Sequence, residues 1–124
     1  MHPVIHHITF DCTGDPYDLG LFWSKLLGRP LADDDKPGDP EALVKDPAGG
    51  PTLLFVRVDE GVTVKNRIHL DLRPQGRTRD AEVERAIGLG ARQIADHTRS
   101  DGGGWVVLAD PEGNEFCVER GEPG

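Results

Sequence analysis

The sequence repeats itself at a spacing close to half its length, and this repeat limits the folds that the chain can adopt. Residues 41–49 (EALVKDPAG) align with residues 105–113 (WVVLADPEG), which lie 64 positions further on. Both stretches predict a short strand that ends in an Asp-Pro-x-Gly turn, because proline presets the first corner of a turn and glycine accepts an unusual backbone conformation. Other pairs recur 62 positions apart: Leu27-Gly28 with Leu89-Gly90, and His7 with His69. We therefore expect two tandem copies of one structural unit.

Each copy has the pattern of a strand, a helix and three further strands. In the first copy Asp15 and Pro16 are typical of a helix start, and Gly28 is typical of a helix end. In the second copy Thr78 or Asp80 is suited to cap the helix. The apolar residues of the first helix have the spacing of one buried face: Leu19, Phe22, Trp23, Leu26 and Leu27.

Length and composition fit one small α+β domain. We expect two βαβββ modules, at about residues 4–60 and 65–120, that form a single domain over residues 1–124. The net charge of −8 argues against nucleic-acid binding, and no apolar run approaches the ~20 residues that a membrane helix needs. Two cysteines, Cys12 and Cys117, are too few for a disulfide framework and fit a reducing compartment. With no signal-peptide pattern, these features predict a cytoplasmic protein that acts on a small molecule.

Alternation along the strands divides the side chains between two faces of the predicted sheet. The isoleucine, leucine, phenylalanine and valine side chains fall mainly on the face that we expect the helices to cover. His7, His69 and Cys117 fall on the opposite face, which we expect to line a cleft. Other residues assigned to the pocket wall are Phe55, Arg67, Trp105 and Glu119. Trp105 also fits the core, and Arg67 either holds an anionic group of a ligand or pairs with a neighbouring acid, as such arginines more often do.

Four stretches carry a resemblance to a known family: HITF at 7–10, FWSKLLG at 22–28, KNRIHLDL at 65–72 and WVVLADPEGNEFC at 105–117. Together with the two-module pattern they resemble the vicinal-oxygen-chelate superfamily, and within it the glyoxalase-like domain branch. That superfamily includes glyoxalase I, fosfomycin-resistance thiol transferases, extradiol dioxygenases, methylmalonyl-CoA epimerases and bleomycin-resistance proteins. The resemblance implies a curved mixed sheet around a concave cleft, with the helices on the outer face. It also implies a homodimer, since relatives commonly pair by a two-fold axis.

The resemblance further implies a metal site on the cleft face. His7 and His69 match the histidines that metal-dependent members use as ligands. The third ligand of the family is a glutamate four residues after the glycine of the last Asp-Pro-x-Gly, and this sequence has Cys117 there. Such a set suits zinc better than magnesium or manganese, because zinc accepts both imidazole and thiolate. In the other interpretation the two histidines are polar pocket residues and Cys117 is a small buried side chain.

Functions from different classes fit these features. In the first, the protein is a small-molecule-binding glyoxalase-like enzyme: a metal-dependent lyase, isomerase or thiol transferase. In the second, it is a non-catalytic module that sequesters a small aromatic or cationic compound, as bleomycin-resistance relatives do, and the net charge of −8 suits a cation. A third hypothesis gives Cys117 a thiol role, which requires that His7 or Arg67 lowers its pKa.

Overall fold

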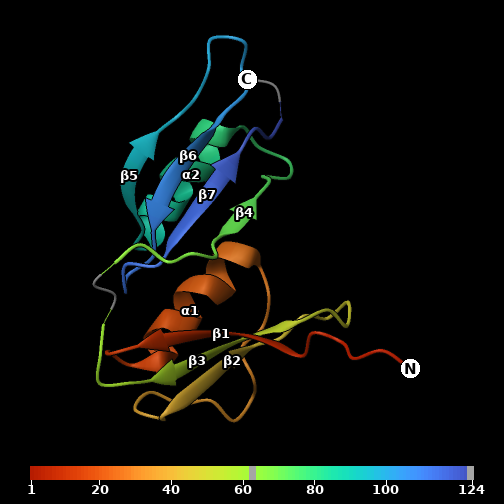
Figure 1. Cartoon of the computed structure of the whole chain (residues 1–124), viewed down its shortest axis with the longest axis vertical. Helices are drawn as coiled ribbons and strands as arrows, with labels where there is room; N and C mark the ends of the chain where they lie inside the picture. Colours follow the sequence, from red (N-terminus) through yellow and green to blue (C-terminus); the bar gives the residue numbers. More distant parts are fainter. Residues whose placement is uncertain (62–63, 123–124) are drawn as a thin grey trace. The chain divides into compact units, whose positions relative to one another are not determined.

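The computed structural model describes residues 1–61 and 64–122, and the chain divides into two compact units, Met1–Gly61 and Val62–Gly124 (Figure 1). Each unit has its own mixed sheet and its own helix, so the fold is α+β, as the sequence predicts. Neither helix of the described residues has the length and apolar character needed to span a bilayer.

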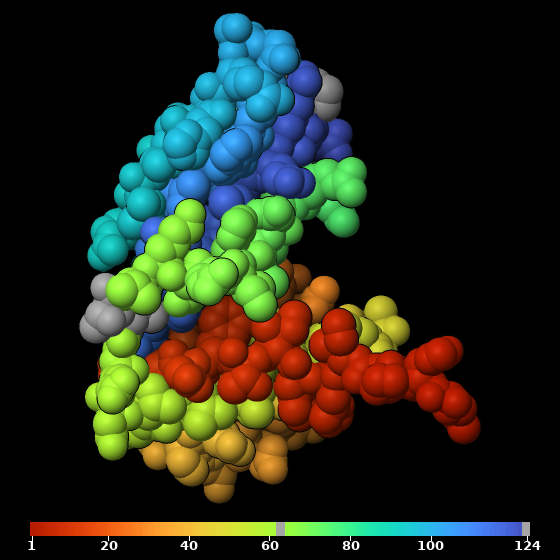
Figure 2. Space-filling view, in the orientation of Figure 1, coloured from red at the N-terminus to blue at the C-terminus, as the bar shows by residue number. Residues whose placement is uncertain are grey.

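The first unit packs a helix on a three-stranded sheet. Its elements are β1 (His7–Cys12), α1 (Pro16–Leu27), β2 (Glu41–Val44) and β3 (Thr52–Arg57). Strand β3 lies in the centre, parallel to β1 and antiparallel to β2. The residues before β1 extend away from the body of this unit (Figure 2). The buried side chains between α1 and the sheet include most of the predicted helix face: Leu19, Phe22, Trp23 and Leu26, with Ala42, Val44, Leu53 and Phe55 from the strands.

The first unit differs from the prediction because two strands follow its helix, not three. Within residues 1–61, an isolated antiparallel bridge between Leu31 and Val44 takes the place of the missing strand. Pro30, just before the bridge, has no backbone N–H with which to continue a strand. Just after it, the carboxylate of Asp35 accepts a hydrogen bond from the backbone N–H of Leu43 at 2.7 Å. The Asp35 carboxylate therefore occupies the backbone N–H of Leu43, which a further strand would need in order to pair with β2.

The second unit has the full predicted order of one strand, a helix and three strands. Its elements are β4 (Leu70–Leu72), α2 (Arg79–Leu89), β5 (Arg92–Asp96), β6 (Trp105–Ala109) and β7 (Glu115–Glu119). The strand order β4-β7-β6-β5 repeats the order β1-β3-β2 of the first unit and adds β5 at the edge. Helix α2 buries a smaller set of residues than α1: Glu82, Val83 and Ala86.

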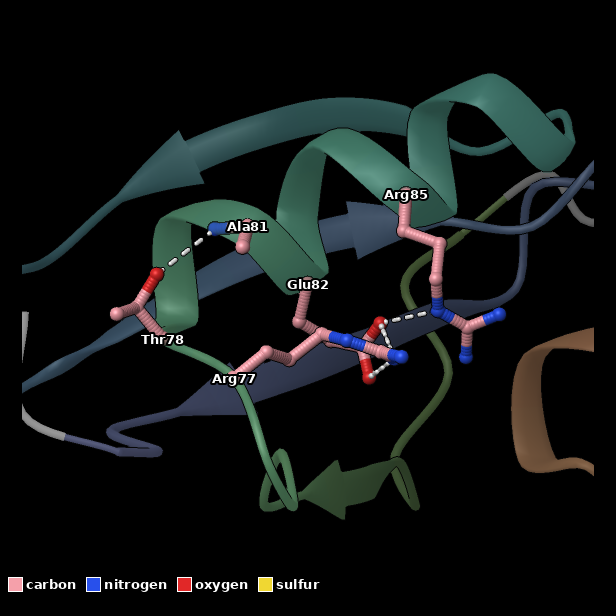
Figure 3. A network of polar contacts seen from close by, with 5 residues as sticks. All are labelled: Arg77, Thr78, Ala81, Glu82 and Arg85. Atoms are coloured by element: carbon pink, nitrogen blue, oxygen red, sulfur yellow. Dashed lines mark hydrogen bonds and ion pairs between the residues drawn. The ribbon is translucent and has the colours of Figure 1, made fainter.

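Helix α2 begins with a capped first turn and a buried acid (Figure 3). Thr78, one of the two predicted caps, accepts a hydrogen bond from the backbone N–H of Ala81 at 3.1 Å. The carboxylate of Glu82 accepts hydrogen bonds from Arg77 at 3.2 and 3.3 Å and from Arg85 at 2.8 Å. These two guanidinium groups offset the cost of burying the charge of Glu82.

The two Asp-Pro-x-Gly turns have the same internal contacts. One begins at Asp46 between β2 and β3, and the other at Asp110 between β6 and β7. The backbone N–H of Gly49 donates to the carbonyl of Asp46 at 3.0 Å, and that of Gly113 donates to the carbonyl of Asp110 at 2.9 Å. In both turns the aspartate side chain also accepts a hydrogen bond, at 2.9 Å, from the backbone N–H two residues on. The glycines have φ angles of 86° and 88°, which explains why glycine stands there.

Candidate functional site

A hollow of about 380 Å³ lies on the face of the second sheet that points away from α2. Alternation along β7 explains this placement, because Phe116 and Val118 are fully buried on the helix side while Cys117 points to the other face. The residues that line the hollow come from β4, β6 and β7, from the position just after β5 and from the segment before β4: Lys65, His69, Asp71, His97, Trp105, Val107, Glu115, Cys117 and Glu119.

Strand pairing brings these side chains together from distant parts of the second unit. Cys117 lies opposite Asp71 of the parallel strand β4 and opposite Val107 of the antiparallel strand β6. Glu119 lies opposite Trp105 in the same way. Of the residues that the sequence analysis assigns to the pocket, the structure thus places four around one hollow: His69, Trp105, Cys117 and Glu119.

Three potential metal ligands converge in this hollow: His69, Asp71 and Cys117. The Nε2 atom of His69 lies 3.2 Å from Oδ1 of Asp71, and the ligand atoms of all three residues lie within 4.8 Å of one another. Zinc bonds of about 2.0–2.3 Å in a tetrahedral arrangement place ligand atoms roughly 3.3–3.8 Å apart, so small side-chain movements complete the site. His69 and Asp71 are exposed and Cys117 is buried, which leaves one side open to a small molecule. The donor set fits a borderline divalent ion such as zinc.

The thiol of Cys117 is disfavoured as a thiolate in the absence of a cation. Burial raises its pKa, and the neighbouring carboxylate of Asp71 raises the pKa further. The hypothesis that a neighbour lowers the pKa of Cys117 is therefore wrong, because its main neighbour is an anion. A bound divalent cation reverses this balance, since the positive charge stabilises the thiolate.

An aromatic pair forms another wall of the hollow. The ring centroids of His97 and Trp105 are 5.2 Å apart, with an angle of 42° between the ring planes. Trp105 is 41% exposed, so it lies on the open face and not in the core. Hairpin pairing holds the two residues together, because the backbone N–H of His97 donates to the carbonyl of Trp105 at 2.8 Å. One cationic and three anionic side chains share this hollow: Lys65, Asp71, Glu115 and Glu119.

Three residues assigned to the site from the sequence are not among those that line the hollow. His7 belongs to the first unit, where its Nδ1 atom forms a 2.5 Å hydrogen bond with Oγ1 of Thr52. Arg67 is exposed in the segment before β4 and is not among the residues that line the hollow. Phe55 requires a correction: it is fully buried, and its ring centroid lies 5.2 Å from that of Phe10. A Cβ added to Gly20 of α1 would lie 3.5 Å from the Phe55 ring, so this ring faces the helix and not the open side of the sheet.

Of the residues that line the hollow, Asp71 could have been identified from the sequence, whereas His97 could not. Asp71 follows His69 by two positions, so alternation alone places both side chains on one face. That spacing is a usable signal for a ligand pair. His97 lies beyond β5 in a segment with the composition of a loop, and hairpin pairing with β6 brings it to Trp105. No local pattern indicates that contact.

A family model described as a glyoxalase-like domain matches residues 7–119. The chain belongs to this family. The match covers both units and agrees with the resemblance to the vicinal-oxygen-chelate superfamily. The search of curated proteins gave no match.

Solved structures share the fold of this glyoxalase-like protein. A glyoxalase/bleomycin resistance protein/dioxygenase family enzyme from Burkholderia phytofirmans PsJN has a TM-score of 0.73 at 18% identity, covering 94% of this chain and 98% of its own. A mutant of the fosfomycin resistance protein FosX from Listeria monocytogenes, complexed with Mn(II) and 1S,2S-dihydroxypropylphosphonic acid, has a TM-score of 0.72 at 18% identity, covering 98% and 93%. The oxidase ChaP-H2 has a TM-score of 0.62 at 18% identity, covering 99% and 96%. These identities establish the fold alone.

Proposed function

We propose that this glyoxalase-like protein binds a small molecule in the hollow of its second unit and acts on it, with a divalent metal ion, as a lyase, an isomerase or a thiol transferase. The observation that carries the proposal is the convergence of a nitrogen, an oxygen and a sulfur donor from His69, Asp71 and Cys117. This mixed set suits zinc more than magnesium or manganese. The Mn(II) complex of FosX from Listeria monocytogenes, which shares the fold, supports a metal in a protein of this architecture.

His7 is proposed as a further ligand, because the family resemblance assigns that role to a histidine of the first module. Its hydrogen bond with Thr52 engages the Nδ1 atom, so Nε2 is the atom that would bind the ion. Replacement of His7 by alanine should then weaken zinc binding. Unchanged zinc affinity in this variant would limit the ligand set to the second unit.

The residues of the hollow have separate roles in this proposal. His69, Asp71 and Cys117 would hold the ion, which would supply a positive charge to polarise a substrate oxygen and stabilise negative charge there. Glu115 and Glu119 flank Cys117 on β7 and face the hollow, so a carboxylate is available to accept a proton from the substrate. The rings of His97 and Trp105 offer a surface for an apolar or planar part of the molecule. The volume of about 380 Å³ suits a small molecule.

Metal binding tests the proposal directly. Zinc titration of the purified protein against a chromophoric chelator should give one ion per chain. His69→Ala and Cys117→Ala should each abolish stoichiometric binding, because the loss of one of the three donors of the second unit leaves too little coordination to hold the ion against water and buffer. His97→Ala is the matched control, since His97 lines the same hollow but lies outside the ligand group. A wild-type protein that takes up no zinc, manganese, nickel or iron would refute the metal-dependent function.

A second candidate function is sequestration of a small aromatic or cationic compound without catalysis. The aromatic pair and the excess of carboxylates in the hollow favour it, because an organic cation is attracted both to an indole face and to anionic side chains. Fluorescence of Trp105 in EDTA-treated protein should then be quenched by a planar organic cation such as ethidium. Trp23 is fully buried and provides a constant background. Tight binding without metal that is lost in Trp105→Ala, as followed by the fluorescence of ethidium itself, would favour sequestration over metal-dependent catalysis.

We further propose that the two units form one domain and that the protein is a cytoplasmic homodimer. Strands β1 and β4 are edge strands of their sheets, and exposed sheet edges are usually covered by another element or another chain. The family resemblance supports the same assembly. Light scattering at micromolar concentration should give twice the chain mass of 13.5 kDa. The mass of one chain at all concentrations would refute the dimer.

A further inference from the structure

The segment that carries His69 into the hollow is fastened by a side chain. Residues 64–69 lead into β4 but belong to no helix or strand. Within them, Nδ2 of Asn66 donates a hydrogen bond to Oδ1 of Asn114 at 3.0 Å. Asn114 lies in the turn between β6 and β7 and is 5% exposed. We refer to this hydrogen bond as the asparagine clasp.

A buried carboxylate fixes the direction of the asparagine clasp. Asp110 is 4% exposed, and its oxygens accept hydrogen bonds from Nδ2 of Asn114 at 2.9 and 3.2 Å and from the backbone N–H of Asn114 at 2.9 Å. Because a carboxylate can only accept, the amide nitrogen of Asn114 must face Asp110 and its oxygen must face Asn66. Asn66 is therefore the donor, and an aspartate at this position cannot replace it.

The internal repeat shows that the turn itself does not need Asn114. The matching residue of the first unit is Gly50, whose backbone N–H donates to the side chain of Asp46 at 3.1 Å. That turn keeps the backbone hydrogen bond from Gly49 to Asp46 and the hydrogen bond from Ala48 to the Asp46 side chain without an amide side chain. A Cβ added to Gly50 would lie 2.3 Å from Oδ2 of Asp46, so a side chain there would require the Asp46 carboxylate to shift. The amide of Asn114 thus has a role beyond the turn, and its partner belongs to the segment that carries His69.

We propose that the asparagine clasp positions His69 for metal binding, with Asn66 and Asn114 as positioning residues; this inference rests on the proposed metal-dependent function. Asp71 and Cys117 are held by the pairing of β4 with β7, whereas His69 precedes that pairing. His69 is only three positions after Asn66 in the sequence, a reach of at most about 11 Å of chain. The clasp therefore restricts the imidazole to the neighbourhood of Asp71, 3.2 Å away. Without it, the segment can move His69 away from its two partners.

Four variants test the asparagine clasp. Asn66→Ala removes the donor and leaves the contacts between Asn114 and Asp110 in place, so it is the main variant. Asn66→Asp keeps the shape but cannot donate. Asn114→Gly gives the second turn the residue of the first turn. Ile68→Ala is the control, because this side chain lies in the same segment and is 83% exposed.

Zinc affinity is the first measurement, made by chelator competition at a temperature at which circular dichroism shows every variant folded. Each clasp variant should bind zinc about 10-fold more weakly, the usual loss when the partner that orients a metal ligand is removed. The double variant of Asn66→Ala and Asn114→Gly should bind zinc no more weakly than the single variant with the lower zinc affinity, because the two substitutions remove the same hydrogen bond. Ile68→Ala should bind like the wild type.

The imidazole proton signals of His69 in metal-free protein are the second measurement, assigned by their loss in His69→Ala. They should shift and broaden in Asn66→Ala, because the ring leaves Asp71, and stay unchanged in Ile68→Ala. If the wild type binds no zinc, the proposed metal function fails, and these signals alone decide whether the clasp positions His69. Unchanged His69 signals in Asn66→Ala, together with unchanged zinc affinity where zinc binds, would overturn the inference.

Discussion

Replacing Phe55 by alanine should strongly destabilise the first unit. The side chain is 0% exposed, and its ring lies against Phe10 and close to the backbone of Gly20. Helix α1 has little room to move into the space left by the ring, because a Cβ at Gly20 would already lie 3.3 Å from Ala42. The loss of apolar burial and the remaining cavity therefore add. We expect the free energy of unfolding to fall by about 3–5 kcal/mol, the range for truncation of a fully buried phenylalanine.

Urea denaturation followed by the fluorescence of Trp23 measures this loss. Trp23 is fully buried in α1, and a Trp105→Phe background removes the other tryptophan signal. With a slope of about 1–3 kcal/mol per molar urea, the midpoint should fall by roughly 2 M. Val56→Ala is the matched control, because Val56 is a half-buried residue of the same strand and should cost about 1 kcal/mol. A loss in Phe55→Ala no larger than in the control would show that Phe55 is not a core residue.

Other features of the second unit give three further tests. Glu82→Gln should lower the free energy of unfolding by about 1–2 kcal/mol, because it weakens the contacts with the partly exposed Arg77 and Arg85. Glu84→Gln, on the exposed side of α2, is the control in the same urea assay. Folding raises the pKa of Cys117 above the value of 9.0 in the unfolded chain, so the unfolded thiol ionises first. The free energy of unfolding should therefore fall as the pH rises through and above 9.0. Cys117→Ser should make the free energy of unfolding depend less steeply on pH in this range. Gly104→Ala should speed hydrogen exchange of the backbone amides in the loop between β5 and β6. The reason is that φ is 84° at this residue and that the added Cβ would lie 2.0 Å from the carbonyl oxygen of His97. Amide exchange as slow as in the wild type would contradict the prediction.

The parts of the fold that follow local rules can be predicted from the sequence. The helix caps Asp15 and Thr78 and the paired turns at Asp46 and Asp110 depend on a few neighbouring residues. The same is true of Cys117, whose neighbours on β7 are both apolar, so alternation identifies its face without ambiguity.

The failures arise where local alternation gives no information. Strand β3 has the apolar run Leu53-Leu54-Phe55-Val56, so either set of alternate residues could face the helix. Pairing with β1, which sets Phe55 beside Phe10, decides the question, and that pairing is a long-range contact. The contact of His97 with Trp105 likewise depends on the hairpin of β5 with β6. In the first unit, Pro30 and Asp35 outweigh the repeat and reduce the expected strand to one bridge.

The unequal burial of the two helices has a consequence for how the molecule fluctuates. Helix α1 buries large apolar side chains such as Phe22 and Trp23, whereas α2 buries the smaller Val83 and Ala86 together with the charged Glu82. A sheet that packs against less apolar surface separates from its helix more readily in local fluctuations, because each such opening exposes less apolar surface to water. The hollow thus belongs to the more compliant half of the chain. We therefore expect its walls to adapt to molecules of different outline more readily than the sheet of the first unit would.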